Sequence, residues 1–195
     1  TSLWAHGDTR RLVLQQLPVA GLCETYSRSS SVTDSAAAGT AIACGMKVDN
    51  SNLGVTYDGR RLRSVAEAAR DMGKSVGLLT TDTLAGATPA AFYAHRIQRN
   101  MMPEIVLDAA ASGFDIIAGN AATRGLFVKN GTGASQRDLQ AEMEAGGYVF
   151  VDEPAGIASA PGDKKVVAQI EERLYKNNDA VIGEMTRAAI GRHAS

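Results

Sequence analysis

Several features that mark specialised classes of protein are scarce in this sequence. The formal net charge is −1, with acidic and basic residues intermixed, so the charge gives no reason to expect a nucleic-acid partner. No apolar run approaches the ~20 residues that a membrane-spanning helix needs, so we expect no membrane partner. Residues 1–20 also lack the basic, apolar and small-residue blocks of a secretory signal peptide. We therefore expect the chain to be soluble.

Residues that bind zinc or form disulfides are scarce as well, with 2 cysteines and 3 histidines in the chain. Cys23 and Cys44 do not have CxxC spacing and have no histidine nearby, which argues against a zinc knot. We expect each to be a small buried residue, and the sequence leaves open whether they pair. His6, His95 and His193 form no cluster suited to zinc, so we expect His95 to be a structural helix residue.

What the chain does have is enough apolar content for one core. Its 195 residues are 45% hydrophobic, which favours a single domain over residues 1–195. Patterns typical of strands alternate with patterns typical of helices. The predicted strands are 18–26, 74–81, 114–118 and 148–151, and the predicted helices beyond Ser35 are 62–72, 103–112, 135–145, 164–176 and 180–190. This alternation predicts a three-layer α/β fold with a mostly parallel central sheet and helices on both faces.

The most informative stretch is residues 32–40, with the sequence VTDSAAAGT. Asp34 or Ser35 can cap a helix that begins here, because the small helix-forming residues follow directly. The N-terminal end of a helix carries roughly half a positive charge, so the Ser35 hydroxyl would lie where an alkoxide or a phosphate is favoured. The alternative is an ordinary N-cap in front of a buried alanine-rich helix.

A second dense stretch covers residues 82–100. Pro89 follows Thr88, and a proline in the first turn predicts a helix that carries His95 and Arg99. Taken alone, Thr88 is a capping or turn residue and Arg99 is a partner in an exposed salt bridge.

Together, these two stretches resemble motifs of the alkaline phosphatase family. Residues 32–40 resemble the nucleophile signature of that family, and residues 86–99 (GATPAAFYAHRIQR) resemble its second metal and phosphate segment. Stretches 18–27 and 74–81 agree with the family in order and spacing. The resemblance implies an alkaline phosphatase-like fold and hydrolysis of phosphate monoesters through a phosphoserine intermediate at Ser35.

The resemblance also implies a role for each matching residue. Ser35 resembles the nucleophile, which contacts a Zn²⁺ ion, and Asp34 resembles the neighbour that steadies a phosphate-binding arginine. Arg99 resembles that arginine, whose planar fork can hold two phosphate oxygens. Thr88 resembles a Mg²⁺ ligand. The implied cofactors are Zn²⁺ and Mg²⁺, the implied partners are phosphate monoesters or inorganic phosphate, and a homodimer and a periplasmic or secreted location are expected.

The chain also departs from the family pattern. Gly86 stands where family members often carry an Asp or His that tunes the magnesium site. The first metal-binding aspartate of the family lies well before the counterpart of Pro18, and only seventeen residues precede Pro18 here. The other acidic and histidine ligands of the family come from segments that follow. We therefore expect the chain to lack N- and C-terminal parts of the family core.

Two functions remain open at this point. One is a metal-assisted phosphate monoester hydrolase that acts through Ser35. The other is a catalytically incomplete fragment or pseudoenzyme that retains only an anion-binding pocket at Ser35 and Arg99. A related sulfatase or phosphodiesterase fits less well, because the residues around Ser35 match phosphatases better. A Ser-His-Asp hydrolase also fits poorly, because no histidine has triad-like spacing from Ser35.

Overall fold

The computed structural model describes residues 13–171, 174 and 180–193. At its centre is a four-stranded parallel sheet with the strand order β1-β2-β4-β3. The strands are β1 (Gly77–Thr83), β2 (Ile116–Asn120), β3 (Tyr148–Val151) and β4 (Lys165–Ile170). The two inner strands, β2 and β4, are almost wholly buried, as expected for parallel strands that are covered on both faces.

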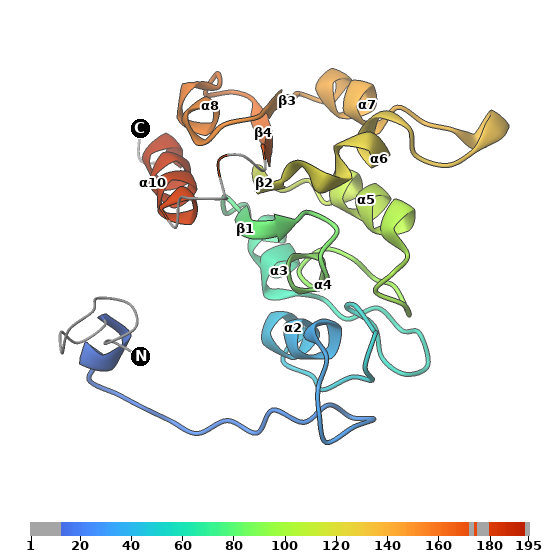
Figure 1. Ribbon diagram of the computed structural model, residues 1–195, viewed down its shortest axis with the longest axis vertical. Coiled ribbons are helices and arrows are strands. Elements are labelled where there is room, and N and C mark those ends of the chain that lie inside the picture. The colour runs from blue at the N-terminus through green and yellow to red at the C-terminus, as the bar shows by residue number, and fades with distance from the viewer. Residues whose placement is uncertain (1–12, 172–173, 175–179, 194–195) are drawn as a thin grey trace.

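Helices cover both faces of the sheet (Figure 1). The first face packs Ile117 and Val167 against three helices, α5 (Met102–Ala111), α6 (Arg124–Val128) and α7 (Leu139–Ala145). The second face packs Ile116 and Val166 against α8 (Pro154–Ser159) and α10 (Val181–His193). The side chains of consecutive residues in one strand thus point to opposite faces of the sheet. The three-layer α/β fold that the sequence predicts is confirmed. Among the described residues, no helix is both long and apolar enough to cross a membrane.

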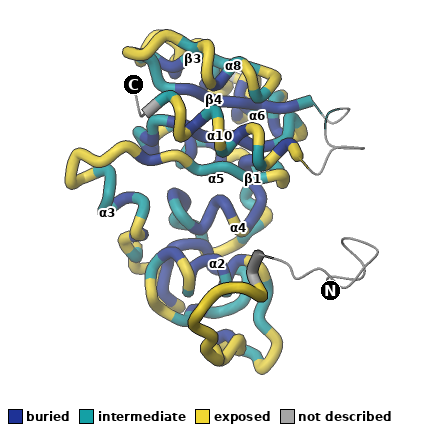
Figure 2. The backbone as a smooth tube through the Cα atoms, turned by 90° about the vertical axis from the view of Figure 1, so that its left-hand side faces the viewer, coloured by how far each residue is buried: buried dark blue, intermediate teal, exposed yellow. Residues whose placement is uncertain are grey.

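Three further helices lie on the β1 side of the sheet, namely α2 (Ser35–Cys44), α3 (Val65–Asp71) and α4 (Ala87–Ala90). Figure 2 shows that the backbones of α2 and α4 are largely buried where they face one another. Their contact is made mostly by alanine and glycine, so the two backbones lie close together. The remaining short elements are the 3-10 turns η1 (Val13–Gln16), η2 (Ala121–Thr123) and η3 (Gly133–Ser135).

The predicted strand at 18–26 is wrong. These residues form no strand and are exposed, because no neighbouring strand pairs with them in the described part of the chain. The segment is held at one end by Lys47, whose Nζ donates to the carbonyl oxygens of Glu24 at 3.0 Å and Tyr26 at 2.7 Å. Cys23 lies in this segment and is exposed, contrary to expectation, and both Cys23 and Cys44 are free thiols.

The predicted helix at 164–176 is also wrong over its first half. Residues 165–170 form β4, the inner strand between β2 and β3, and residues 172, 173, 175 and 176 lie outside the described residues. A short apolar run bounded by charged residues is compatible with either element, and here burial between two helical layers selects the strand.

Other elements also differ from the sequence predictions, and the bounds of β1, β2 and α3 are shifted by one to three residues from the predicted ranges. The helix at Thr88 ends at Ala90, so His95 and Arg99 are not helical. Helices α6 and α8 form at 124–128 and 154–159, outside all of the predicted helices. Helix α7 begins at Leu139 rather than Ser135, because Asp138 caps it by accepting a hydrogen bond from Ala141 N at 2.9 Å. The predicted strand at 148–151 and the predicted helix at 180–190 are confirmed as β3 and α10.

Candidate functional site

Ser35 is the first residue of α2, and Asp34 is its N-cap. The Asp34 side chain accepts a hydrogen bond from Ala37 N at 2.9 Å, as the capping pattern predicts. The first N–H groups of a helix have no partner within it, so those of Ser35 and Ala36 are free to bind a ligand. Ser35 is exposed, and its hydroxyl has no hydrogen-bond partner in the described part of the chain. The hydroxyl is therefore free to react at the positive end of the helix.

The carboxylate of Asp34 joins this helix end to two other segments. Its Oδ2 atom accepts a hydrogen bond from Ser51 N at 3.0 Å and forms an ion pair with Arg99 Nη1 at 3.4 Å. This ion pair is long and uses one N–H of the guanidinium, and the Arg99 side chain is 40% exposed. Arg99 thus lies beside the residue that precedes Ser35, with most of its donors available for an anion.

The loop beside Asp34 is held in a strained conformation. Among the described residues, Ser51 is the one non-glycine residue with positive φ, at 75°. Its neighbour Asn50 donates to Val32 O at 3.1 Å and accepts from Asp34 N at 3.1 Å. These contacts fix the backbone on both sides of Asp34, so they also fix the direction of its carboxylate.

Thr88 approaches the same face of α2. A Cβ atom on Gly39 would lie 3.4 Å from Thr88 Cα and 3.0 Å from Ala91 Cβ, so α2 and α4 meet where side chains are smallest. Gly39 follows Ser35 by four residues, which places the two on one side of the helix. Thr88 is exposed and lies about one helical turn from Ser35 along that side.

Asp82, near the end of β1, is a candidate residue that the sequence analysis missed. A Cβ atom on Gly86 would lie 2.3 Å from Asp82 Oδ2, so the Asp82 carboxylate occupies the space into which a side chain at position 86 would project. Position 86 itself has no acidic side chain, but the carboxylate of Asp82 lies in the space beside it. An acid at the carboxyl end of a parallel strand is the signal that could have identified it.

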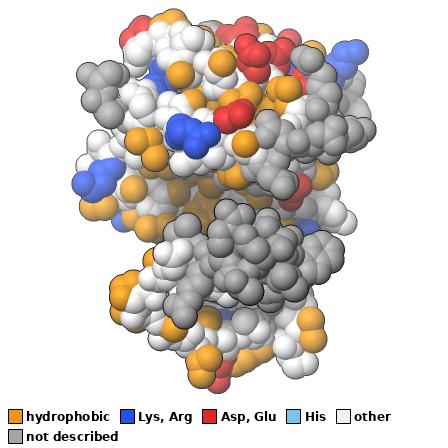
Figure 3. Space-filling model, turned by 60° about the vertical axis from the view of Figure 1, so that its left-hand side comes forward, with side chains coloured by type: hydrophobic (Ala, Val, Ile, Leu, Met, Phe, Trp, Pro, Cys, Tyr) orange, Lys and Arg blue, Asp and Glu red, His pale blue; other side chains and the backbone are white. Residues whose placement is uncertain are grey.

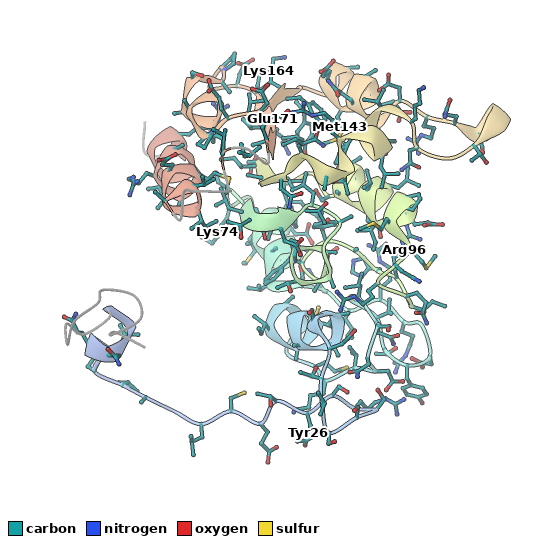
Figure 4. The ribbon with its side chains drawn as sticks, in the orientation of Figure 1. Tyr26, Lys74, Arg96, Met143, Lys164 and Glu171 are labelled. Atoms are coloured by element: carbon teal, nitrogen blue, oxygen red, sulfur yellow. The ribbon has the colours of Figure 1, made fainter. Side chains whose placement is uncertain are left out.

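The segment that carries Arg99 is anchored by its neighbours. Arg96 binds Asp108 through two hydrogen bonds, Nε–Oδ2 at 2.8 Å and Nη2–Oδ1 at 2.6 Å, and its backbone pairs with Leu53. Figure 4 labels Arg96 close to α5, the helix that supplies Asp108. The backbone therefore leaves α4 and is fixed again three residues before Arg99.

His95 also serves this anchor. Its Nδ1 lies 2.8 Å from Gly54 O and its Nε2 lies 3.0 Å from Glu67 Oε1, with both side chains nearly buried at 8% and 11% exposure. Both ring nitrogens therefore lie within hydrogen-bond distance of oxygen atoms of the protein. His95 is therefore committed to the structure and is not available as a base for Ser35.

The structure thus brings Asp34, Ser35 and Arg99 together and places Thr88 on the same side of α2. His6 lies outside the described residues. No group of three or more His, Cys, Asp or Glu residues able to hold a metal ion occurs among the residues that the structure describes. The donors near Ser35 are hydroxyl and carboxylate oxygens, a set that suits Mg²⁺ and does not fit the nitrogen- and sulfur-rich ligand sets typical of Zn²⁺.

Comparisons with known proteins point to one family. The sequence model of the family described as "Alkaline phosphatase" matches residues 4–123. Alkaline phosphatase 4 of Bacillus subtilis is 37% identical over 126 residues, which cover 62% of this chain and 26% of that protein. The human tissue-nonspecific isozyme is 36% identical over 104 residues, which cover 48% of this chain and 20% of that protein. The chain thus matches about a quarter of the length of these curated relatives.

Solved structures agree with the sequence comparison. Thermus thermophilus alkaline phosphatase superposes with a TM-score of 0.80 at 31% identity, over 99% of this chain and 42% of that chain. A mutant TAB5 alkaline phosphatase with Mg bound in its M3 site superposes with a TM-score of 0.81 at 26% identity, over 97% of this chain and 55% of that chain. Nearly all of this chain therefore has a counterpart in about half of each solved structure.

Proposed function

Because the chain belongs to the alkaline phosphatase family, we propose that it carries the nucleophile and the phosphate-binding arginine of a phosphate monoester hydrolase. One observation carries the proposal. The Asp34 carboxylate caps α2 and also pairs with Arg99, so a guanidinium lies beside an exposed serine hydroxyl at a helix N-terminus. A dianionic phosphate group would meet positive partial charge on one side and a full positive charge on the other.

In the proposed reaction, Ser35 Oγ attacks the phosphorus atom of a phosphate monoester. The bond between phosphorus and the ester oxygen breaks, the alcohol leaves, and Ser35 carries the phosphoryl group. Water then attacks the same phosphorus atom, which releases inorganic phosphate and restores the hydroxyl. Arg99 and the free N–H groups of Ser35 and Ala36 would hold the non-bridging oxygens during both steps.

The residues that would hold a Mg²⁺ ion are Thr88, which supplies a hydroxyl oxygen beside α2, and Asp82, which supplies a carboxylate oxygen beside Gly86. When bound, a divalent ion supplies positive charge that stabilises an oxyanion. The described residues do not offer a zinc ligand set, so no step is assigned to zinc. Proton removal from Ser35 is likewise not assigned to His95, because both of its ring nitrogens are already engaged.

Hydrolysis of p-nitrophenyl phosphate by the purified chain, with and without Mg²⁺ and Zn²⁺, tests the proposal. We expect Ser35→Ala to abolish turnover while the circular dichroism spectrum remains unchanged, since the Ser35 hydroxyl makes no contact within the described residues. Equal turnover by Ser35→Ala and the parent would remove Ser35 from the mechanism. Bound phosphate without turnover would support the alternative, a non-catalytic chain that retains the anion pocket.

Arg99→Ala tests the binding half of the proposal separately. We expect phosphate affinity to fall at least about tenfold, because a charged hydrogen-bond partner of the anion is lost. Stability should change by less than about 1 kcal/mol, since the ion pair with Asp34 is single and partly exposed. Isothermal titration with phosphate and urea unfolding measure the two effects. Arg137→Ala is the control, because Arg137 is exposed and pairs with Glu142; equal phosphate binding by Arg99→Ala and this control would exclude Arg99.

A further inference from the structure

A second pocket lies at the carboxyl ends of β3 and β4, well away from Ser35. It has a volume of about 290 Å³ and is lined by Arg124, Gln140, Phe150, Val151, Asp152 and Gln169. We call it the Gln169 pocket. Figure 4 labels Glu171, next to this pocket, in the upper half of the molecule, whereas Tyr26, which lies near α2, is at the lower end. In the view of Figure 3, hydrophobic side chains are visible in the hollow between the upper and lower parts of the molecule.

The sheet topology favours a ligand at this position. The chain leaves β2 through η2 and α6, which packs on the first face of the sheet, whereas α10, which follows β4, packs on the second face. Adjacent parallel strands whose connections turn to opposite faces leave a crevice at their carboxyl ends, and ligands of open α/β sheets bind in such crevices. This crevice lies between β2 and β4, and the Gln169 pocket borders it, because Arg124 comes from the connection after β2 and Gln169 lies on β4.

Gln169 carries a donor that the protein leaves unused. It is 2% exposed and projects to the same face as Val167, toward α6 and α7. Its Oε1 accepts from Arg124 Nε at 3.4 Å, which fixes the amide orientation because the reverse would set NH₂ against the guanidinium. Its Nε2 then has no hydrogen-bond partner in the described part of the chain. An orphaned buried amide is rare and requires an explanation.

Arg124 adds further donors to the same pocket. Its Nη1 donates to Glu171 Oε1 at 2.9 Å and its Nη2 to Gln169 O at 3.0 Å. With Nε engaged as well, two of its five N–H groups have no partner among the described residues. The terminal torsion of a glutamine side chain is broad, so a small rotation would turn the Gln169 amide toward an acceptor in the pocket.

The charges and walls of the pocket select the kind of acceptor. Glu171 pairs with Arg124, and Asp152 adds a negative charge among the lining residues, so a dianion such as phosphate is repelled about twice as strongly as a monoanion. The N–H groups of Gln169 and Arg124 that have no partner among the described residues can offset the repulsion of a single charge. Phe150 and Val151 add an apolar wall that suits carbon atoms. The volume lies at the lower limit of ligand pockets, which restricts the occupant to a small molecule. We propose that the Gln169 pocket binds a small organic monocarboxylate whose oxygens accept from Gln169 Nε2 and Arg124.

Propionate, glycolate and inorganic phosphate serve as probes, each at the same ionic strength with sodium chloride as the reference. We expect propionate or glycolate to raise the melting temperature of the parent chain in proportion to the logarithm of its concentration. The same carboxylate should shift the side-chain NH₂ resonances of Gln169 in an NMR titration. The Gln169→Met variant keeps the side-chain length and removes the amide, and its affinity for the carboxylate should fall at least fivefold.

The unliganded stability of Gln169→Met separates binding from a structural role. If the orphaned amide is retained for a ligand, the variant without carboxylate should melt at the same temperature as the parent or higher, because removal of a buried unpaired donor outweighs loss of the long 3.4 Å bond from Arg124 Nε. Gln136→Met is the matched control, since Gln136 is exposed and does not line the pocket. The Gln136→Met variant should leave both the carboxylate affinity and the melting temperature without carboxylate unchanged.

A carboxylate effect no larger than that of chloride would overturn the proposal, and so would equal carboxylate affinity in the parent and Gln169→Met. The outcome is independent of the Ser35 site. Any stabilisation by phosphate should disappear in Arg99→Ala and persist in Gln169→Met, whereas stabilisation by carboxylate should show the opposite pattern. Stabilisation by phosphate that is lost in Gln169→Met would also contradict the choice of a monocarboxylate.

Discussion

The two ends of α2 carry two potential nucleophiles in opposite settings. At the first end, Ser35 is exposed beside free N–H groups and near Arg99. At the other end, Cys44 is half-buried, with its Sγ 4.0 Å from the carbonyl oxygen of Leu62. Burial, and to a lesser extent the negative charge of Glu67, raise the pKa of the Cys44 thiol to about 11. The end of the helix that holds the thiol therefore resists negative charge, and the end that holds the hydroxyl favours it.

This difference shows that the surroundings of a side chain in the fold can matter more than its intrinsic acidity. A free thiol is far more acidic than a serine hydroxyl, yet its surroundings keep Cys44 protonated and unreactive at neutral pH. Ser35 gains its potential from neighbours that are fixed by the fold, namely the capping carboxylate, the helix end and the guanidinium. Substitutions at the two ends of α2 should therefore have different consequences, which the following three predictions address.

The largest effect is expected at Asp34. Asp34→Ala removes the helix cap, the acceptor for Ser51 N and the partner of Arg99 together. We expect a loss of about 2 kcal/mol in the free energy of unfolding, most of it from the cap, and weaker phosphate binding because Arg99 is no longer oriented. Urea unfolding and isothermal titration with phosphate measure these losses.

Asp34→Asn distinguishes the cap from the charge. The amide oxygen can still accept from Ala37 N, so most of the stability should be retained. The ion pair with Arg99 is weakened, so phosphate binding should change more than stability does. Equal destabilisation by Asn and Ala would show that the cap is not the main contribution of Asp34.

The sequence revealed this end of the helix because its signals are local. A capping acid, a serine and a run of small residues lie next to one another, and the predicted helix start agrees with the observed cap at Asp34. The position of Arg99 could be expected only through resemblance to a family motif. Its actual path depends on the pairing of Leu53 with Arg96 and on the contacts of His95 with Gly54 and Glu67, which join residues distant in sequence.

Asp82 and β4 also could not be predicted from the sequence, because each depends on contacts in the assembled fold. Asp82 becomes a candidate only when the turn after β1 brings it over Gly86, and spacing along the chain does not show this approach. The strand β4 is predicted to be part of a helix because residues 165–170 (KVVAQI) show no clear alternation of apolar and polar side chains. Burial on both faces, which removes the alternation, is a property of the assembled sheet.

A smaller effect is expected at the opposite end of α2. Gly45 ends the helix in the left-handed region with φ of 70°, and no atom lies within 4 Å of where its Cβ would be. Gly45→Ala should therefore cost about 1 kcal/mol through backbone strain alone and leave phosphate binding unchanged. Gly21→Ala is the matched control, because Gly21 is equally free of neighbours and has no positive φ. Weaker phosphate binding by Gly45→Ala would show that the two ends of the helix are coupled.

The smallest effect concerns the proton on Cys44. Its pKa is raised from 9.0 to about 11 in the folded chain, so the folded state holds this proton more tightly than the unfolded state does. The contribution to stability is complete below pH 9 and is lost as the pH rises through 11. The free energy of unfolding should therefore fall more steeply between pH 9 and pH 11 in the parent than in Cys44→Ala.

Cys23→Ala provides the control for the pH dependence, since Cys23 is exposed and should leave the slope of the parent unchanged. Burial also raises the pKa of Tyr148 to about 12, but this contribution is common to all three proteins and cancels in the comparison. Alkylation by iodoacetamide at pH 8 gives an independent measure, with Cys23 modified well before Cys44 because the thiolate is the reactive form. If the pH dependence of unfolding is the same in the parent and Cys44→Ala, or if Cys23 and Cys44 are alkylated at equal rates, the C-terminal end of α2 does not suppress the thiolate. The contrast with Ser35 would then depend on Arg99 and the N-cap alone.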